Sequence, residues 1–305
     1  MKKHSRIRLM AQAVWFALTN GYVRGFMQGK IYTGNLKKIC EPGLNCYSCP
    51  GAYFSCPIGS LQAVLDSGQY RFSLYVFGMM TAFGVLLGRF VCGWLCPFGL
   101  VQDLLYRIPL PGRTSRFFTK QKNMPGHSYL IYGKYVVLAL FVLVLPMAVK
   151  GIAGTGDPWF CKYICPSGTL FAGLPLIAAT PALRNALGAL FTWKAFVLLL
   201  IVLLSLKYYR PFCKYLCPLG AFYGFFNRFA FLRLAVDKTS CIHCGKCQAV
   251  CKMDIRVWEQ PNAMECIRCG DCRAACPTGA IYMPGLRNKK KKVGLHNSLQ
   301  LSRRL

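Results

Sequence analysis

The sequence predicts a mainly α-helical membrane protein: a polytopic bundle of about four spanning helices, built as two parallel half-repeats and followed by a small cysteine-rich α+β domain. Only 15% of the residues are charged and 54% are hydrophobic, whereas soluble domains have roughly 25% charged residues. Cysteine accounts for 18 of the 305 residues. The length excludes a small disulfide scaffold, and the apolar content excludes a disordered basic chain.

Three stretches are long and apolar enough to cross the roughly 30 Å hydrocarbon core of a bilayer. They cover residues 72–91, 129–149 and 190–206. A fourth and weaker candidate, residues 9–27, is interrupted by Gln12 and Asn20, so a helix lying on the membrane surface is its alternative. These assignments predict five segments: 1–36, with basic residues and the weak first helix; 37–71, an outer cysteine-rich loop; 72–229, the membrane helices; 230–285, the cysteine-rich domain; and 286–305, a polybasic tail.

The basic residues predict the orientation and the surroundings of the chain. There are 38 Lys and Arg against 9 Asp and Glu, a formal charge of +29. Their excess in the short loops favours cytoplasmic N- and C-termini and multi-pass insertion in the cytoplasmic membrane of a prokaryote. The tail is expected to contact anionic lipid, and the positive field would attract an acidic carrier of the ferredoxin or flavodoxin type. Nucleic acid is not expected as a partner, because the basic residues are scattered among apolar segments.

The C-terminal domain contains two copies of one cysteine motif, Cys-x2-Cys-x2-Cys-x3-Cys. This spacing is typical of bacterial ferredoxins with two [4Fe-4S] clusters, in which the fourth cysteine of each run binds the other cluster. Paired Cys-x2-Cys elements also bind zinc, but a zinc site does not use a third cysteine at the same spacing in both copies. The expected cluster ligands are Cys241, Cys244, Cys247 and Cys276 for one, and Cys266, Cys269, Cys272 and Cys251 for the other.

The membrane half contains a Cys-x3-Cys-Pro motif three times, and two of these motifs end equivalent half-repeats. Spacing of i, i+4 places both thiols on one face of a helical turn, and proline suits the first position of the next helix. If the halves pack in parallel, the cysteines gather near the two membrane faces. We expect metal ligation or redox chemistry at an inner tetrad, Cys92, Cys96, Cys213 and Cys217, and at an outer set, Cys49 or Cys46 with Cys56, Cys161 and Cys165.

Alternatives remain for the membrane cysteines. They can be packing residues at helix ends, and those at the outer face can form disulfides, for which Cys40 and Cys46 are the best candidates. Other redox cofactors are not predicted. None of the four histidines lies in a confident span to hold haem, and neither a flavin site nor a nucleotide-binding Gly-x-Gly-x-x-Gly motif is present. No catalytic residue is assigned.

With these motifs, over roughly residues 60–284, the chain resembles the NapH-type family of integral membrane 4Fe-4S proteins. The resemblance implies four spans, cytoplasmic clusters and electron exchange between the quinone pool and partner proteins. The same motif plan occurs in the membrane regulator of nitrous oxide reduction and in a cupric-reducing assembly factor of terminal oxidases. Two departures are the additional outer segment Cys46-YSCPGAYFSCPIGS and the lack of the regulator's flavin-binding domain.

The leading functional hypothesis is a membrane iron-sulfur protein that relays electrons between a cytoplasmic carrier or the quinone/quinol pool and a partner redox enzyme at the outer face. Such a protein would be a quinol dehydrogenase-like component of an oxidoreductase system. An alternative of a different class is reduction or handling of copper during metalloenzyme assembly, because thiolates suit Cu(I). A third is a membrane anchor whose ferredoxin domain supports a partner enzyme.

Overall fold

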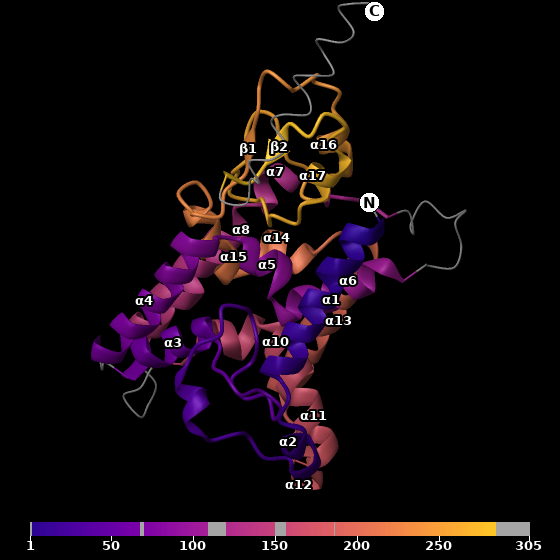
Figure 1. The fold of residues 1–305 in the computed structure, drawn as a ribbon. Coiled ribbons are helices and arrows are strands. Elements are labelled where there is room, and N and C mark those ends of the chain that lie inside the picture. The colour runs from indigo at the N-terminus through magenta and orange to yellow at the C-terminus, as the bar shows by residue number, and fades with distance from the viewer. Residues whose placement is uncertain (1, 68–69, 109–119, 150–156, 186, 285–305) are drawn as a thin grey trace, which may run out of the picture.

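A computed structural model describes residues 2–67, 70–108, 120–149, 157–185 and 187–284. The chain is mainly helical, and the small C-terminal domain covers one end of the helices (Figure 1). The polybasic tail 286–305 and the glycine-rich loop 151–156 lie outside the described residues.

The first half of the helical region contains one long N-terminal helix, a cysteine-rich loop, a helix pair and the first pair of short helices around a Cys-x3-Cys-Pro motif. Its elements are α1 (Lys2–Thr19), α2 (Val23–Gln28), η1 (Asn35–Lys38), α3 (Pro57–Ser67), α4 (Tyr70–Leu87), α5 (Phe90–Trp94) and α6 (Pro97–Arg107).

The second half repeats this plan with more irregular helices, several of them π-helical. Its elements are α7 (His127–Leu130), α8 (Gly133–Val136), η3 (Val137–Val144), α9 (Leu145–Ala148), η4 (Phe160–Ile164), α10 (Pro166–Gly168), η5 (Thr169–Gly173), α11 (Leu174–Ala179), α12 (Pro181–Asn185), α13 (Ala189–Lys207), α14 (Pro211–Tyr215) and α15 (Pro218–Phe226).

Two helices among the described residues are long and apolar enough to cross a membrane, His127–Ala148 and Ala189–Lys207. Only 22% and 17% of their apolar windows are buried inside the protein. Their exposed apolar faces include Leu140 on the first, and Phe196 and Leu203 on the second.

The two other expected spans are interrupted. The helix expected over 9–27 is not continuous, since α1 ends at Thr19 and α2 begins at Val23. At this break the side chains of Thr19 and Asn20 both donate to the Phe16 carbonyl oxygen, each at 3.3 Å, a form of local bonding that short polar side chains offer to the backbone. The helix expected over 72–91 ends at Leu87, because Gly88 adopts a φ of +53°.

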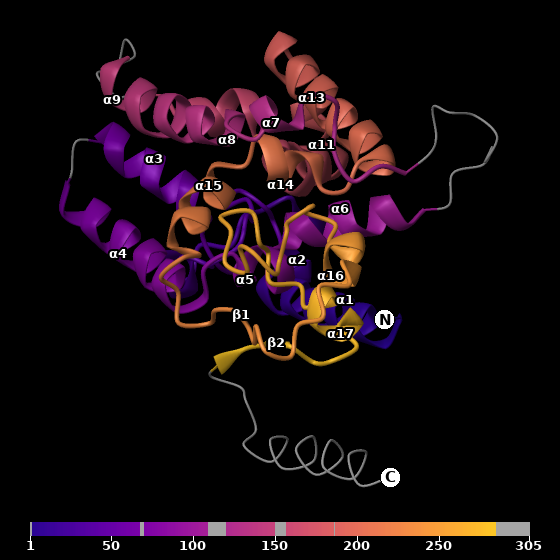
Figure 2. The same ribbon diagram turned by 90° about the horizontal axis from the view of Figure 1, so that it is seen from above.

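The two halves meet at the paired motifs. Across this junction α15 of the second half packs against α4 of the first, and α6 of the first half packs against α13 of the second (Figure 2). Proline opens α6 and α15, and the preceding cysteine of each caps its helix. The buried rings of Phe98 and Phe212 pack edge to face, with centroids 5.2 Å apart. The motif cysteines therefore lie in the core of the protein.

The C-terminal domain contains a two-stranded antiparallel sheet, β1 (Ala235–Val236) and β2 (Ile281–Tyr282), and the short helices α16 (Lys246–Val250) and α17 (Asp271–Ala275). Each helix follows a glycine in the left-handed region, Gly245 at φ +69° and Gly270 at φ +81°. The two cysteine runs consequently fold into similar loops. The N-terminal end of α1 lies beside α17, with His4 Nδ1 3.8 Å from Asp271 Oδ1.

Candidate iron-sulfur sites

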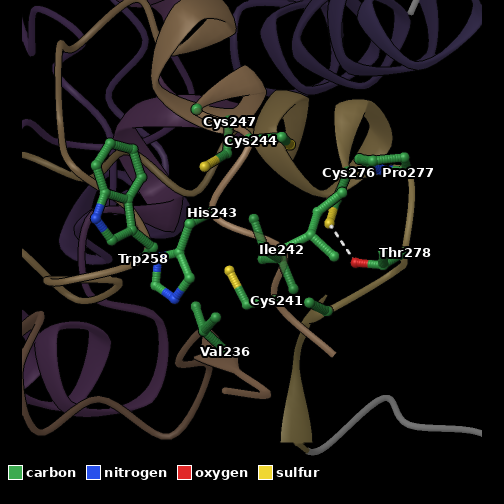
Figure 3. Close-up of a pocket in the computed structure, with 13 residues that line it drawn as sticks. Val236, Cys241, Ile242, His243, Cys244, Cys247, Trp258, Cys276, Pro277 and Thr278 are labelled. Carbon is green, nitrogen blue, oxygen red and sulfur yellow. Dashed lines mark hydrogen bonds between the residues drawn. The ribbon is translucent and has the colours of Figure 1, made fainter. Parts of the chain in front are cut away.

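The first group of cysteines lines a pocket at the exposed end of the C-terminal domain (Figure 3). Its members are Cys241, Cys244, Cys247 and Cys276, with apolar walls that include Trp258 and Ile281. Cys276 comes from the second cysteine run. The pocket therefore contains three cysteines of the first run and the fourth cysteine of the second, the combination that ferredoxin spacing predicts.

The surroundings of Cys276 suit a thiolate. Burial opposes ionisation, but hydrogen bonds from the Thr278 hydroxyl and from the N–H groups of Ala280 and Ile281 lower the pKa of this thiol. Cys276 Sγ lies 3.6 Å from Thr278 Oγ1. Because thiolates, not thiols, bind metal, this pocket favours the ligand form.

The second group of cysteines is buried against the helical region. Cys272 interacts electrostatically with Cys266, Cys269 and Cys251. Cys251 Sγ accepts a 3.5 Å hydrogen bond from the Ile255 N–H. This group also contains one cysteine from the other run, so each ferredoxin group is closed by the fourth cysteine of its neighbour.

The inner tetrad, Cys92, Cys96, Cys213 and Cys217, is assembled at the junction of the two halves. Cys217 interacts electrostatically with the other three thiols, and all four residues are buried. Cys96 Sγ and Cys217 Sγ each accept a 3.4 Å hydrogen bond, from the N–H groups of Gly99 and Gly220 respectively. Cys213 Sγ accepts a 3.0 Å bond from Gln102 Nε2.

The fourth group, which we call the outer tetrad, consists of Cys46, Cys56, Cys161 and Cys165. Cys161 interacts electrostatically with Cys46 and Cys165, and Cys56 interacts with all three of the others. Lys194 lies beside this group and donates to the Cys161 carbonyl oxygen at 3.2 Å.

The structure places Cys46 rather than Cys49 among the outer cysteines. Cys49 Sγ instead donates to Asn20 Oδ1 at 3.6 Å, and Cys40 forms a backbone bridge with Ser55. All eighteen cysteines are free thiols in the structure. Sequence spacing left Cys46 and Cys49 as alternatives, because both lie in one irregular loop.

The chemistry of the donor sets fits iron-sulfur clusters. Each group offers four cysteines, the usual ligands of a [4Fe-4S] cluster. Among the described residues, no three His, Cys, Asp or Glu side chains converge on the position of a single metal ion. A cubane holds its four thiolates farther apart than a single ion does. When bound, such clusters supply one-electron transfer.

The buried ferredoxin group lies directly on the inner tetrad. A Cβ atom at Gly93 would lie 2.2 Å from the Ile267 carbonyl oxygen, so helix α5, which carries Cys92, touches the loop after Cys266. Trp94 Nε1 donates to the Arg268 carbonyl oxygen at 3.1 Å. In the second motif, Lys214 Nζ donates to the Lys252 carbonyl oxygen at 2.9 Å.

Tyr223 lies between the inner and outer tetrads. This residue is fully buried and interacts electrostatically with Cys92 and Cys96 of the inner tetrad and with Cys56 of the outer tetrad. Its hydroxyl donates to the Pro42 carbonyl oxygen at 3.0 Å, which ties α15 to the loop that carries Cys46. The four cysteine groups thus form one series.

This series defines a ferredoxin-type iron-sulfur electron transport protein. A family model described as a 4Fe-4S binding domain matches residues 72–117, 138–177 and 190–237, and a second model with the same description matches 260–282. An uncharacterized protein of Methanocaldococcus jannaschii is 34% identical over 65% of this chain and 71% of its own length. The chain belongs to the 4Fe-4S-binding, ferredoxin-type family that these matches define.

Two relatives with more descriptive names match less closely. The methylamine utilization ferredoxin-type protein MauN of Methylorubrum extorquens is 28% identical over 55% of this chain and 48% of its own length. The putative electron transport protein YccM of Escherichia coli is 23% identical over 84% of this chain and 66% of its own length. No solved structure matches the chain.

Proposed function

We propose that this protein relays electrons through a membrane, between the side that carries the ferredoxin domain and the opposite side. The observation that carries the proposal is the series of four cysteine groups, linked by the contact of Gly93 with Ile267 and by Tyr223 between the membrane tetrads. Short contacts between successive groups are what a chain of one-electron carriers requires.

The arrangement in the membrane is the four-span topology of NapH-type proteins. Besides the two long apolar helices, α1 and α4 cross the bilayer, and both termini face the cytoplasm. The close approach of His4 to Asp271 supports this orientation, because it holds the N-terminal end of α1 beside the ferredoxin domain. Exposed apolar side chains on α1 and α4, such as Met10, Val14 and Phe77, support contact with lipid.

The partners at the two ends are a cytoplasmic donor and an outer-face acceptor. An acidic ferredoxin or flavodoxin is the cytoplasmic candidate, since the chain has a formal charge of +29 and such a field steers acidic proteins. Cys244, the exposed cysteine of the pocket in Figure 3, lies where such a carrier can approach. The quinone pool is the alternative donor or acceptor.

The test is anaerobic iron quantification with EPR spectroscopy on the full chain, reconstituted in detergent. Two [4Fe-4S] clusters account for about eight iron atoms per chain, so a larger number is expected for the wild type. The Cys92→Ser variant should lose the additional iron and one EPR signal, while Cys40→Ser, the matched control, should lose neither. A wild type with about eight iron atoms and unchanged Cys92→Ser spectra would refute an inner cluster.

The same variants separate electron relay from copper handling. If the membrane tetrads handle copper, the wild type reduces and retains added copper, and Cys92→Ser and Cys213→Ser abolish this chemistry without changing the iron content. Electron relay predicts instead that both variants block electron transfer to an acceptor on the opposite side of a vesicle.

A further inference from the structure

At the inner tetrad, one arginine from each half-repeat extends its side chain to the cysteine motif of the other half-repeat. We call this arrangement the arginine exchange. Arg89 and Arg210 each stand three residues before the first cysteine of their own motif. Each guanidinium crosses to the other motif: Arg89 Nη2 donates to the Cys213 carbonyl oxygen at 3.2 Å, and Arg210 Nη1 donates to the Cys92 carbonyl oxygen at 2.5 Å. The third motif has no arginine at the equivalent position, where Pro158 stands.

Both arginines are fully buried and held by carboxylates. Arg210 binds Asp103 in a bidentate manner, Nε to Oδ1 at 2.8 Å and Nη2 to Oδ2 at 2.6 Å. Arg89 Nη1 binds Glu265 Oε2 at 2.7 Å, and Glu265 also pairs with Lys134. Burying a guanidinium group destabilises the folded protein unless a paired carboxylate compensates its charge. Two such buried pairs beside one cysteine tetrad therefore indicate a specific role for the arginines.

The guanidinium groups also lie under the helix ends that cap the tetrad. A Cβ atom at Gly99 would lie 3.3 Å from Arg210 Nη1, and one at Gly220 would lie 3.3 Å from Arg89 Nη2. These are the two glycines whose N–H groups donate to tetrad sulfur atoms. Each guanidinium therefore binds the backbone of the opposite cysteine motif and packs against a glycine that donates to a tetrad sulfur.

The electrostatic surroundings of the tetrad are net cationic. Arg89 and Arg210 both interact with Cys213, and Lys134 interacts with Cys217. These three cations stand against two carboxylates, Asp103 and Glu265. Arg8 is also buried and pairs with Asp103 at 3.3 Å, but it approaches Asp271 at 4.0 Å as well. Neutral thiols would leave this positive excess uncompensated in the interior.

We propose that Arg89 and Arg210 are positioning residues that adapt the inner tetrad to an anionic iron-sulfur centre and raise its reduction potential. The inference rests on the proposed function, since it assumes a cluster at the inner tetrad. Reduction adds negative charge to a cluster that already has four thiolate ligands. A nearby fixed positive charge stabilises the reduced form more than the oxidised form.

The test is a potentiometric EPR titration of the reconstituted full chain. The signal of the inner centre is defined as the one that Cys92→Ser removes. Arg89→Gln and Arg210→Gln should each lower the equilibrium constant for its reduction about tenfold, a shift of ~59 mV for one electron. Arg89→Lys and Arg210→Lys keep the charge and should shift it less. The control Arg107→Gln removes an exposed arginine and should leave the signal unchanged.

Each outcome has a defined meaning. An unchanged potential in both Gln variants would overturn the inference, even though the inner centre itself would be established. Absence of the additional signal from the wild type would instead refute the inner cluster of the proposed function. If a Gln variant loses the centre but keeps the ferredoxin signals, its Lys variant decides. Recovery of the centre supports an electrostatic role, and failure to recover it overturns that role in favour of packing.

Discussion

Gly93 and Ile267 are in such close contact that the backbone of one cysteine motif rests on the backbone of another. A Cβ atom added to Gly93 would lie 2.2 Å from the Ile267 carbonyl oxygen, far inside the normal contact distance of these atoms. This contact joins α5, in the helical region, to a cysteine-containing loop of the ferredoxin domain. Gly93 follows Cys92 of the inner tetrad and Ile267 follows Cys266 of the buried ferredoxin group, so the contact links the two groups.

The Gly93→Ala variant should therefore weaken the docking of the ferredoxin domain. The added methyl group meets a backbone oxygen that cannot move away freely, and overpacking of this kind costs about 1–3 kcal/mol. We expect faster amide hydrogen exchange in residues 230–284. Gly78→Ala is the matched control, because a Cβ atom there meets nothing within 4 Å. Equal protection in the two variants would show that the contact does not hold the domain.

Asp103 should contribute strongly to stability. It pairs with both Arg8 and Arg210 and is 2% exposed. Asp103→Ala leaves the buried Arg210 without its carboxylate and leaves Arg8 only its longer contact with Asp271. Loss of one partner from a buried ion pair typically costs about 3–5 kcal/mol. Thermal unfolding of the detergent-solubilised protein measures this loss.

Asp157→Ala is the control for Asp103→Ala. Asp157 pairs with Lys162 at 2.6 Å, but its side chain is 47% exposed, so its loss should cost about 0–1 kcal/mol. Similar unfolding temperatures for the two variants would contradict the importance assigned to the buried network.

Cys46 and Cys49 provide a direct test of the outer tetrad. Cys46 interacts with Cys161 and Cys165, whereas Cys49 bonds to Asn20. If the outer tetrad binds a cluster, Cys46→Ser should reduce the iron content and Cys49→Ser should not. The reverse result would assign Cys49 as the fourth ligand.

Glu41 should make stability depend on pH. Burial raises the pKa of its carboxyl group from 4.5 to about 8, although a hydrogen bond from Asn45 opposes the rise. Between about pH 4.5 and 8, the Glu41 carboxyl group consequently stays protonated in the folded protein but is ionised in the unfolded chain. Stability attributable to this group is complete below about pH 4.5 and falls as the pH rises toward 8.

The Glu41→Gln variant should remove this dependence. It keeps a hydrogen-bond acceptor for Asn45 and cannot ionise, so its unfolding temperature should exceed that of the wild type increasingly between pH 5 and 8. Glu259→Gln changes an exposed carboxylate paired with Arg256 and serves as the control. Parallel profiles for wild type and Glu41→Gln would show that the Glu41 carboxylate is stabilised by other means.

Local sequence patterns reveal some residues of the site but not the contacts that give them a role. The repeated Arg-x2-Cys spacing at Arg89 and Arg210 was visible in the sequence, but its meaning depends on Asp103 and Glu265, which come from α6 and from the ferredoxin domain. Tyr223 belongs to no recognisable sequence motif, so its position between the two tetrads could not be predicted. The break after Thr19 coincides with side-chain hydrogen bonds from Thr19 and Asn20 to the Phe16 carbonyl oxygen, which the apolar content of a twenty-residue window does not reflect.

Ligand spacing alone suffices to predict two ferredoxin-type cluster sites and the repeated Cys-x3-Cys-Pro motifs, because these features are local: a short spacer dictates which thiols share a loop or a helical turn. The order of the four cysteine groups is a different matter. It depends on contacts between residues far apart in the chain, such as Gly93 with Ile267 and Tyr223 with Pro42. Those contacts are decided only when the two halves pack against each other and against the ferredoxin domain. The same packing places Cys46, rather than Cys49, in the outer tetrad and brings Arg89 and Arg210 to the opposite cysteine motifs.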